Sequence, residues 1–227
     1  MESFGPQFLK ILEIIWINII LSGDNAVVIA MACHGLPPDK RRIGMVLGAG
    51  VAVALRIIFT IVVATLLATP FLRILGSLLL VWVAVKLITD EGGEDDGIQA
   101  STKLWDAVRT VAIADAVMSL DNVLAIAAVA KDSTFLLVLG LAISIPLIVA
   151  GATLIMKLLD RFPILVWAGA ALLGWIAGEM LDSDPWLIGQ IGAEAAHRLE
   201  LPAAILGALI VVGLGYLLTR GRPAHPA

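Results

Sequence analysis

The sequence ILSGDNAVVIAMA at residues 20–32 is similar to VMSLDNVLAIAAV at residues 117–129, 97 residues further along the chain. Both stretches hold an Asp-Asn pair, beginning at Asp24 and at Asp121, inside an apolar run. An apolar run of about 20 residues can cross a bilayer, and an ionisable side chain within it is costly unless it is paired or functional. The two stretches therefore predict a membrane protein with an internal repeat and with polar groups inside the membrane.

The composition of the whole chain agrees with this prediction. Of the 227 residues, 60% are hydrophobic, against about 45–50% in soluble domains, and 15% are charged, against about 25%. The mean hydropathy is +1.00. So apolar a chain is neither a soluble enzyme nor a disordered protein, and its formal net charge of −4 argues against nucleic acid as a partner. A single cysteine, Cys33, allows no disulfide within the chain.

Seven segments are long and apolar enough to be membrane-spanning helices, since about 30 Å of hydrocarbon needs about 20 helical residues. We expect these helices at 8–33, 43–69, 71–89, 104–130, 135–157, 163–181 and 201–219. The breaks between them contain proline, glycine or charge, and the longest are the acidic stretch at 90–97 and the segment 182–202. The predicted fold class is an all-α membrane protein with seven transmembrane helices.

The similarity between the two halves of the chain extends beyond the Asp-Asn pairs. Four positions of the third segment correspond to positions 93 residues later in the sixth, so that Gly76, Trp82 and Ala84 recur as Gly169, Trp175 and Ala177, and Lys86 corresponds to Glu179. A unit of three helices crosses the membrane an odd number of times, so its two copies run in opposite directions, as in many secondary transporters. The alternative is an old duplication that is kept only for packing. We expect one transmembrane domain over 1–227, with inverted repeat units at 8–89 and 104–181, a connecting loop at 90–103 and an appended seventh helix at 201–219.

The lysines and arginines near the ends of the segments predict the orientation, because cytoplasmic loops hold the excess of these residues. Eight lie on one side, namely Lys40, Arg41, Arg42, Lys103, Lys157, Arg161, Arg220 and Arg222. Four lie on the other, namely Lys10, Arg73, Lys131 and Arg198. This bias places the C-terminus in the cytoplasm and the N-terminus outside, in the inner (plasma) membrane of the cell.

Polar residues form matching stripes on the first and fourth segments. At 100° per residue, Asn18, Ser22 and Asn25 share one face, as do Asp115, Ser119 and Asn122, with Asp24 and Asp121 on the flanks. If the two helices meet, they gather carboxylate, amide and hydroxyl oxygens near the middle of the membrane. Oxygen ligands favour Mn²⁺, Mg²⁺ or Ca²⁺, and an aspartate that takes up a proton when the metal leaves would couple metal movement to protons. The alternative is a polar contact between helices.

Lys86, Glu179 and Arg56 also lie within predicted spans. Lys86 and Glu179 occupy equivalent repeat positions with opposite charge, so we expect a structural ion pair or side chains that reach for the membrane interface, with a substrate role as the alternative. Arg56 has two interpretations. It compensates the charge of an aspartate, or it forms part of a gate that competes with a bound cation.

The stretches Leu21–Ala26 and Ser119–Val123 resemble the TerC family of integral membrane proteins, in particular its short YjbE-like branch of metal transporters. The resemblance covers nearly the whole chain and includes Arg56, Trp82 and the segment Gly174–Glu179. It implies the LysE-like transporter superfamily, Mn²⁺ efflux and an association with tellurite resistance. It also implies the metal ligands, which are Asp24, Asn25, Asp121 and Asn122, with Asp115 added as a ligand or proton carrier.

These observations predict an exporter of divalent cations, Mn²⁺ first, driven by proton exchange. Its partners would be the lipid bilayer, the transported ion and protons, with no tightly bound cofactor. The first alternative is an exporter of small organic solutes such as amino acids on the same scaffold. The second is a non-transporting membrane scaffold that helps to insert or metallate other proteins. We expect no enzymatic activity, since neither a nucleophile–base pair nor a cofactor motif occurs in the sequence.

Overall fold

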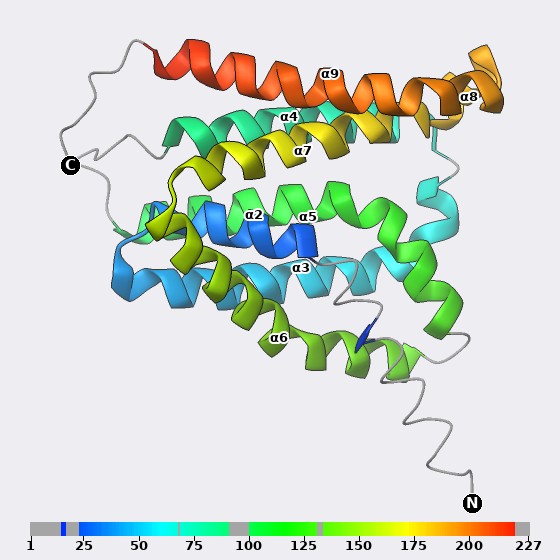
Figure 1. Cartoon of the computed structure of the whole chain (residues 1–227). Helices are drawn as coiled ribbons and strands as arrows, with labels where there is room; N and C mark the ends of the chain where they lie inside the picture. Colours follow the sequence, from blue (N-terminus) through cyan, green and yellow to red (C-terminus); the bar gives the residue numbers. More distant parts are fainter. Residues whose placement is uncertain (1–14, 17–22, 68, 91–99, 131–133, 221–227) are drawn as a thin grey trace, which may run out of the picture. The chain divides into compact units, whose positions relative to one another are not determined.

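The computed structural model describes residues 15–16, 23–67, 69–90, 100–130 and 134–220, and for 61, 63–67, 90, 100–102, 120–130 and 134–137 it describes the backbone alone. These residues form helices and no strand (Figure 1). The helices are α2 (Gly23–His34), α3 (Pro38–Leu67), α4 (Leu72–Asp90), α5 (Ala100–Ala130), α6 (Thr134–Arg161), α7 (Ile164–Asp182), α8 (Pro185–Ile191) and α9 (Ala193–Thr219). The predicted all-α class is confirmed for the described residues. Helices are the expected form of such a chain, because a helix satisfies its own backbone hydrogen bonds in lipid.

Five of the helices are long and apolar enough to cross a membrane, and they coincide with five of the seven predicted spans. They are Pro38–Thr60, Leu72–Thr89, Val138–Arg161, Ile164–Asp182 and Ala193–Thr219. Of the other two predicted spans, 104–130 lies within the continuous helix α5, and 8–33 is described mainly from Gly23 onward, as α2. The chain is thus a multi-pass membrane protein, while the arrangement of seven spans stays a prediction.

The break predicted at 182–202 is wrong over most of its length. The chain turns at Ser183 and Asp184, forms the short helix α8, and begins α9 at Ala193 after Gly192, whose φ of 82° is favourable for glycine. Pro202 lies inside α9. A proline inside a helix costs about 3 kcal/mol, because it removes one hydrogen bond and its ring clashes with the preceding turn, yet α9 continues through this position. The residues before it, which are strong helix formers, favour this continuation.

The chain divides into two compact units, and each of them contains helices from both predicted repeat units. The first unit contains α2, α3, α5 and α6 as far as Leu158, and the second contains α4, α7, α8 and α9. The first unit thus takes the first two predicted helices of each repeat. The second unit takes the third helix of each repeat together with the seventh.

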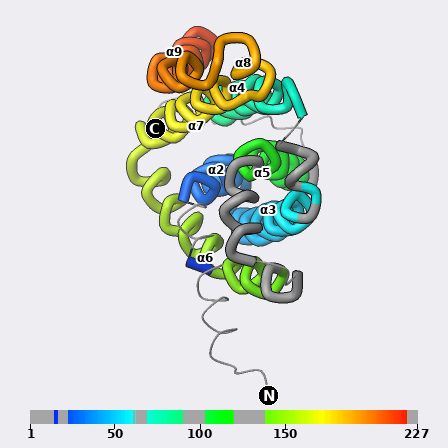
Figure 2. Tube along the Cα trace, turned by 90° about the vertical axis from the view of Figure 1, so that its right-hand side faces the viewer, coloured from blue at the N-terminus to red at the C-terminus, as the bar shows by residue number. Residues whose placement is uncertain are grey.

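In the first unit α5 packs against both α3 and α2 (Figure 2). Gly48 of α3 makes room for Val111 of α5, since a Cβ added at Gly48 would lie 3.3 Å from a methyl carbon of Val111. On the other side of the unit, Gly151 of α6 lies against Ala26 of α2. Small residues at these contacts let the helix backbones approach closely, as is common in membranes.

In the second unit α7 packs against both α4 and α9, which also contact each other (Figure 2). The contact of α7 with α9 is made by backbone on backbone, because Gly174 faces Gly207 and Gly178 faces Ala203. A Cβ added at Gly174 would lie 2.6 Å from the Gly207 carbonyl oxygen, a distance too short for any side chain. On the α4 side, the buried Ser77 hydroxyl donates to the Ala177 carbonyl over 2.6 Å.

The fully buried Asp184 carboxylate caps two helices of the second unit at once. It accepts from the Trp186 amide at the start of α8 over 2.9 Å. It also accepts from the amides of Phe71, just before α4, and of Arg73 and Ile74 in its first turn, over 3.1–3.4 Å. Helix starts have amides with no partner in the helix, and a carboxylate is a favourable acceptor for them. This capping also orients Phe71, whose φ of 64° is unusual for a residue with a side chain.

Candidate functional site

The first unit contains a buried arginine on α3. The Arg56 side chain is 1% exposed, and its Nη2 donates to Asp115 Oδ1 on α5 over 2.7 Å. The Asp115 side chain is 2% exposed. An isolated charge at this depth would cost several kcal/mol in desolvation, so each of the two charges makes the other tolerable.

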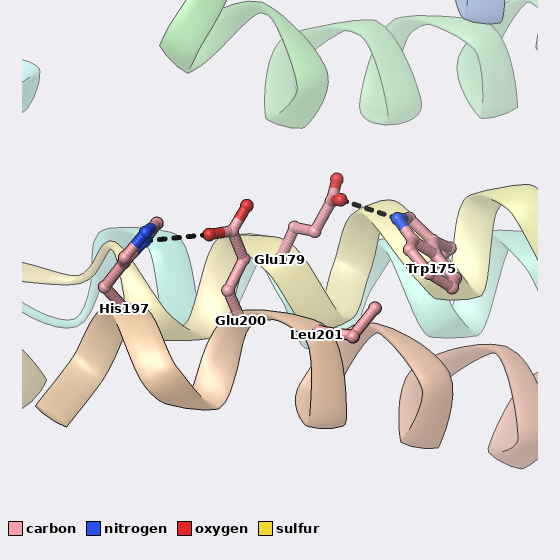
Figure 3. Close-up of a pocket in the computed structure, with 5 residues that line it drawn as sticks. All are labelled: Trp175, Glu179, His197, Glu200 and Leu201. Atoms are coloured by element: carbon pink, nitrogen blue, oxygen red, sulfur yellow. Dashed lines mark hydrogen bonds and ion pairs between the residues drawn. The ribbon is translucent and has the colours of Figure 1, made fainter.

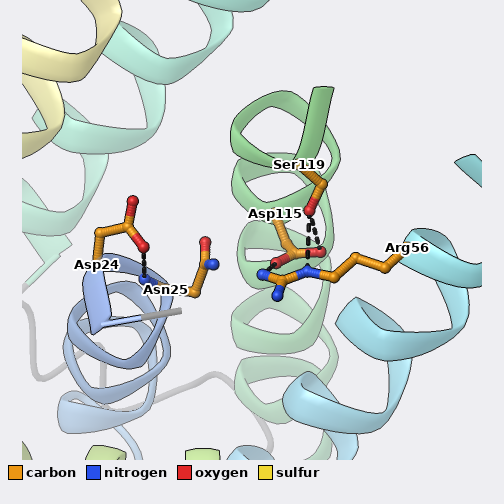
Figure 4. Close-up of polar contacts among 5 residues, drawn as sticks. All are labelled: Asp24, Asn25, Arg56, Asp115 and Ser119. Carbon is orange, nitrogen blue, oxygen red and sulfur yellow. Dashed lines mark hydrogen bonds and ion pairs between the residues drawn. The ribbon is translucent and has the colours of Figure 1, made fainter. Parts of the chain in front are cut away.

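Ser119 completes the contact between α3 and α5. Its hydroxyl lies one turn beyond Asp115, accepts from Arg56 Nε over 3.1 Å and donates to Asp115 Oδ2 over 3.1 Å (Figure 4). Both carboxylate oxygens and two guanidinium nitrogens are therefore engaged within one closed group. We call Arg56, Asp115 and Ser119 the buried triad.

The first turn of α2 places two further polar residues near the buried triad. Asn25 is buried at 3% exposure and Asp24 is half-buried. Asp24 Oδ1 accepts from the Asn25 backbone amide over 2.8 Å (Figure 4). Asp24 also lies within electrostatic range of both Arg56 and Asp115. Because α2 packs on α5, the carboxylate, amide and hydroxyl oxygens of these residues and of the buried triad lie in one part of the first unit.

The structure brings together Asp24, Asn25, Asp115 and Ser119 from the predicted site, with Arg56 beside Asp115 in one of the two arrangements that the sequence left open. The side chains of the other predicted ligand and shell residues lie outside the part of the chain that the structure describes. Asp121 and Asn122 lie in α5 but only their backbone is described, and Asn18 and Ser22 lie outside the described residues. The convergence of Asp24 with Asp121 therefore stays a prediction.

Lys86 and Glu179, in the second unit, each contact a tryptophan of their own helix, and the predicted ion pair between them stays a prediction. Glu179 Oε1 accepts from the Trp175 indole nitrogen over 2.5 Å, one turn back on α7. Lys86 Nζ lies 5.6 Å from the centre of the Trp82 ring, one turn back on α4. Each group is thus stabilised within its own helix, by a hydrogen bond to a charged acceptor and by a cation–π contact.

The second unit holds a group of ligand-type side chains that the sequence reasoning missed. Asp182, His197 and Glu200 each present one ligand atom, and these atoms all lie within 4.8 Å of one another. The available signal was the spacing of three residues between His197 and Glu200, which puts both on one face of a helix. That signal was lost because 182–202 was predicted as a break without a helix.

Comparisons with known proteins agree on one family. The family described as "Integral membrane protein TerC family" matches residues 4–222. An uncharacterized membrane protein of Bacillus subtilis (strain 168), YjbE, is 38% identical over 208 residues, which cover 92% of this chain and 95% of that protein. A second membrane protein of the same organism, YceF, is 26% identical over 88% of this chain and 76% of its own length. No solved structure matches the chain.

Proposed function

This chain belongs to the TerC family of integral membrane proteins, and on that premise we propose that it exports divalent metal cations, Mn²⁺ first, in exchange for protons. The proposal includes the inner (plasma) membrane as location and the predicted orientation, with the N-terminus outside and the C-terminus in the cytoplasm. The observation that supports it most is the buried group of Asp24, Asn25 and the buried triad. Such groups are rare inside membranes and are typical of ion pathways.

The chemistry of the group favours a hard dication over other cargoes. Its ligand atoms are carboxylate, amide and hydroxyl oxygens, which suit Mn²⁺, Mg²⁺ and Ca²⁺. In our proposal Asp24 and Asp121 bind the metal directly and Asn25 and Asn122 complete its shell. Asp115 joins as a ligand or as the proton carrier.

Arg56 supplies a mechanism for release in this proposal. The Arg56 guanidinium forms an ion pair with the Asp115 carboxylate. A dication that binds among the aspartates must therefore compete with Arg56 for this carboxylate. When Arg56 returns to Asp115, the metal loses a ligand. A protein cation that alternates with the substrate cation keeps the buried carboxylates compensated in both states, which avoids leaving a charge unpaired inside the membrane.

The proposed mechanism uses the inverted repeat that the sequence predicts. Each compact unit contains helices from both predicted repeat units, with α2 and α5 packed together in the first unit and α4 and α7 in the second. Two copies of a three-helix unit that run in opposite directions are related by a pseudo-twofold axis in the membrane plane. In such transporters the substrate binds near the middle of the membrane, where the copies meet.

The test is metal flux in liposomes that contain only the purified protein. We expect wild-type protein to transport Mn²⁺ across the liposome membrane when a proton gradient drives protons in the opposite direction. The Asp24→Asn variant should slow this flux by about tenfold or more, since even outer partners of a metal ligand change affinity on that scale. Asp39→Asn is the matched control, because Asp39 lies at the exposed start of α3, outside the buried group.

Three outcomes would contradict the proposal, and two of them point to the alternatives. Equal Mn²⁺ flux with wild type and Asp24→Asn removes the site assignment. Flux of amino acids without flux of Mn²⁺ indicates the organic-solute exporter. No flux of any ion or solute indicates the non-transporting scaffold. The amino-acid alternative also needs a cation for the substrate carboxylate, and Arg56 is engaged by Asp115.

A further inference from the structure

The contact between α7 and α9 consists of small residues along most of its length and is followed by ionisable residues at one end. Gly174 faces Gly207 and Gly178 faces Ala203, so the numbering rises along one helix as it falls along the other and the helices are antiparallel. One turn beyond Gly178 on α7 comes Asp182, and three residues before Ala203 on α9 comes Glu200. The same stripe that brings the two backbones together therefore places two carboxylates opposite each other.

Each helix contributes a second ionisable residue one turn from the first. On α7, Glu179 precedes Asp182 by three residues, and on α9, His197 precedes Glu200 by three. Residues three apart share a helix face. Figure 3 shows the side chains of Glu179 on α7 and of His197 and Glu200 on α9 extending to the same side of the helix pair, with His197 Nδ1 2.9 Å from Glu200 Oε2. The four residues form what we call the α7–α9 cluster.

The α7–α9 cluster lies at an open cavity of about 340 Å³. Its lining is Trp175, Glu179, His197, Glu200 and Leu201. The His197 side chain is 82% exposed and that of Glu200 is 44% exposed, so ions can reach the cluster from water. Trp175 donates its indole N–H to Glu179 and fixes one carboxylate at the wall of the cavity.

The charges in the α7–α9 cluster call for a cation. Three carboxylates face one imidazole, and Asp182 experiences the like charges of both Glu179 and Glu200. The basic residue next in sequence, Arg198, is directed to Glu194, whose Oε1 lies 3.6 Å away. The close backbone packing of α7 on α9 prevents the like charges from relaxing by separation of the helices.

We propose that the α7–α9 cluster binds a divalent first-row transition-metal ion, with Asp182, His197 and Glu200 as ligands and Glu179 as a fourth ligand or an outer partner. Nothing in this inference rests on the transport function proposed above. One imidazole with carboxylates is a donor set for Zn²⁺, Mn²⁺ or Fe²⁺, whereas Mg²⁺ and Ca²⁺ prefer oxygen alone.

The geometry needs little change to hold such an ion. A Zn²⁺ ion lies about 2.0–2.2 Å from nitrogen and oxygen ligands, which puts the ligand atoms about 3–4 Å from one another. The three ligand atoms already lie within 4.8 Å of one another. Rotations of the exposed side chains close this difference, while the helices that hold them stay in place.

The experiment measures Zn²⁺ binding to full-length protein in detergent micelles by equilibrium dialysis and metal analysis. The Asp24→Asn variant serves as the background, so that the buried group of the first unit adds little to the signal. In this background we expect one site per chain. His197→Gln and Asp182→Asn should each weaken it by tenfold or more. Glu194→Gln, on the same helix and 91% exposed, should leave it unchanged.

A second readout separates ligation from a general effect of charge or folding. Bound Co²⁺ should show visible absorption whose spectrum changes in His197→Gln and is retained in Glu194→Gln. All variants should keep the size-exclusion profile and helical content of the parent protein. The inference is overturned if His197→Gln and Asp182→Asn bind Zn²⁺ like the parent, or if Glu194→Gln weakens binding as much. Because Asp24 is already replaced, a loss of Mn²⁺ flux in that variant leaves this result unaffected.

Discussion

At the residue scale, the buried ion pair between Arg56 and Asp115 offers the most informative substitutions. Arg56→Met leaves the Asp115 carboxylate buried without its partner, and Asp115→Leu does the same to the guanidinium. Breaking a buried pair from one side costs about 3–5 kcal/mol, whereas replacing both partners with apolar residues is often neutral. We therefore expect both single variants to lose several kcal/mol of stability and the double variant to recover most of it.

Thermal unfolding of the four proteins in detergent micelles measures this cycle. An Asp39→Leu variant is the control, because the Asp39 side chain is 72% exposed at the start of α3. If the double variant lost as much stability as the two single variants together, Arg56 and Asp115 would not be each other's main partner. Transport should fail in the double variant although its fold is restored, since Asp115 belongs to the proposed cation site.

At the residue scale the sequence predicted the polar stripes but not their partners. Periodicity placed Asp115 and Ser119 on one face of a helix, and the structure has them in hydrogen-bond contact. It could not choose the aspartate that Arg56 meets, because that choice depends on how α3 crosses α5. Asp184 was missed altogether, since a cap that serves two helices is visible only once both helix starts are placed together.

At the scale of elements, the glycines of α9 are not equivalent. Gly207 lies against the α7 backbone, so that an added Cβ would lie 3.1 Å from the Gly178 nitrogen and closer still to the Gly174 carbonyl oxygen. Gly213, on the same helix, has no atom within 4 Å of an added Cβ. We expect Gly207→Ala to cost about 1–3 kcal/mol, as overpacking does. Gly213→Ala should be neutral, or stabilising by up to about 1 kcal/mol through helix propensity.

Chemical and thermal unfolding of these two variants in the same detergent would test the contact of α7 with α9. Equal stability of Gly207→Ala and Gly213→Ala would argue against the close approach. The comparison also bears on the α7–α9 cluster, because the same contact sets the distance between its two halves. Gly207→Ala should therefore weaken Zn²⁺ binding, whereas Gly213→Ala should not.

The sequence predicted the existence of elements better than their ends. Five apolar segments became helices long enough to span a membrane, since length and hydropathy alone decide that property. The observed helix ends differ from the predicted ones where helix-breaking and helix-forming residues lie close together in the sequence. Pro202 indicated a stop, yet the helix-forming residues before it extended α9 back to Ala193. The basic residues Lys40 to Arg42 were predicted as a loop and lie in the first turns of α3, after a proline at its first position.

At the scale of the whole molecule, the sequence predicted a repeat but not how its helices pack. Matching positions predict which helices are equivalent. They do not predict that each compact unit contains helices from both predicted repeat units, with α2 and α5 in one and α4 and α7 in the other. That arrangement depends on helix–helix contacts between small residues, which hydropathy does not record.

Orientation in the membrane is the property of the whole molecule that links the proposed export to the α7–α9 cluster. The bias of lysine and arginine predicts that the start of α3 lies in the cytoplasm and the start of α9 outside. Cys33 is the single cysteine and is fully buried, so a Cys33→Ala background gives a clean probe. A membrane-impermeant maleimide should label Arg198→Cys in intact cells and Lys40→Cys only after the cells are opened.

The reverse labelling pattern would invert the orientation and with it the direction of the proposed transport. It would also move the α7–α9 cluster to the cytoplasmic side, because His197 and Glu200 flank Arg198 on α9. In the expected orientation the cluster meets metal ions of the external medium, away from the cytoplasmic pool that an exporter draws on. External Zn²⁺ should then protect Arg198→Cys from the maleimide at concentrations that fill the cluster, and His197→Gln in the same protein should abolish the protection.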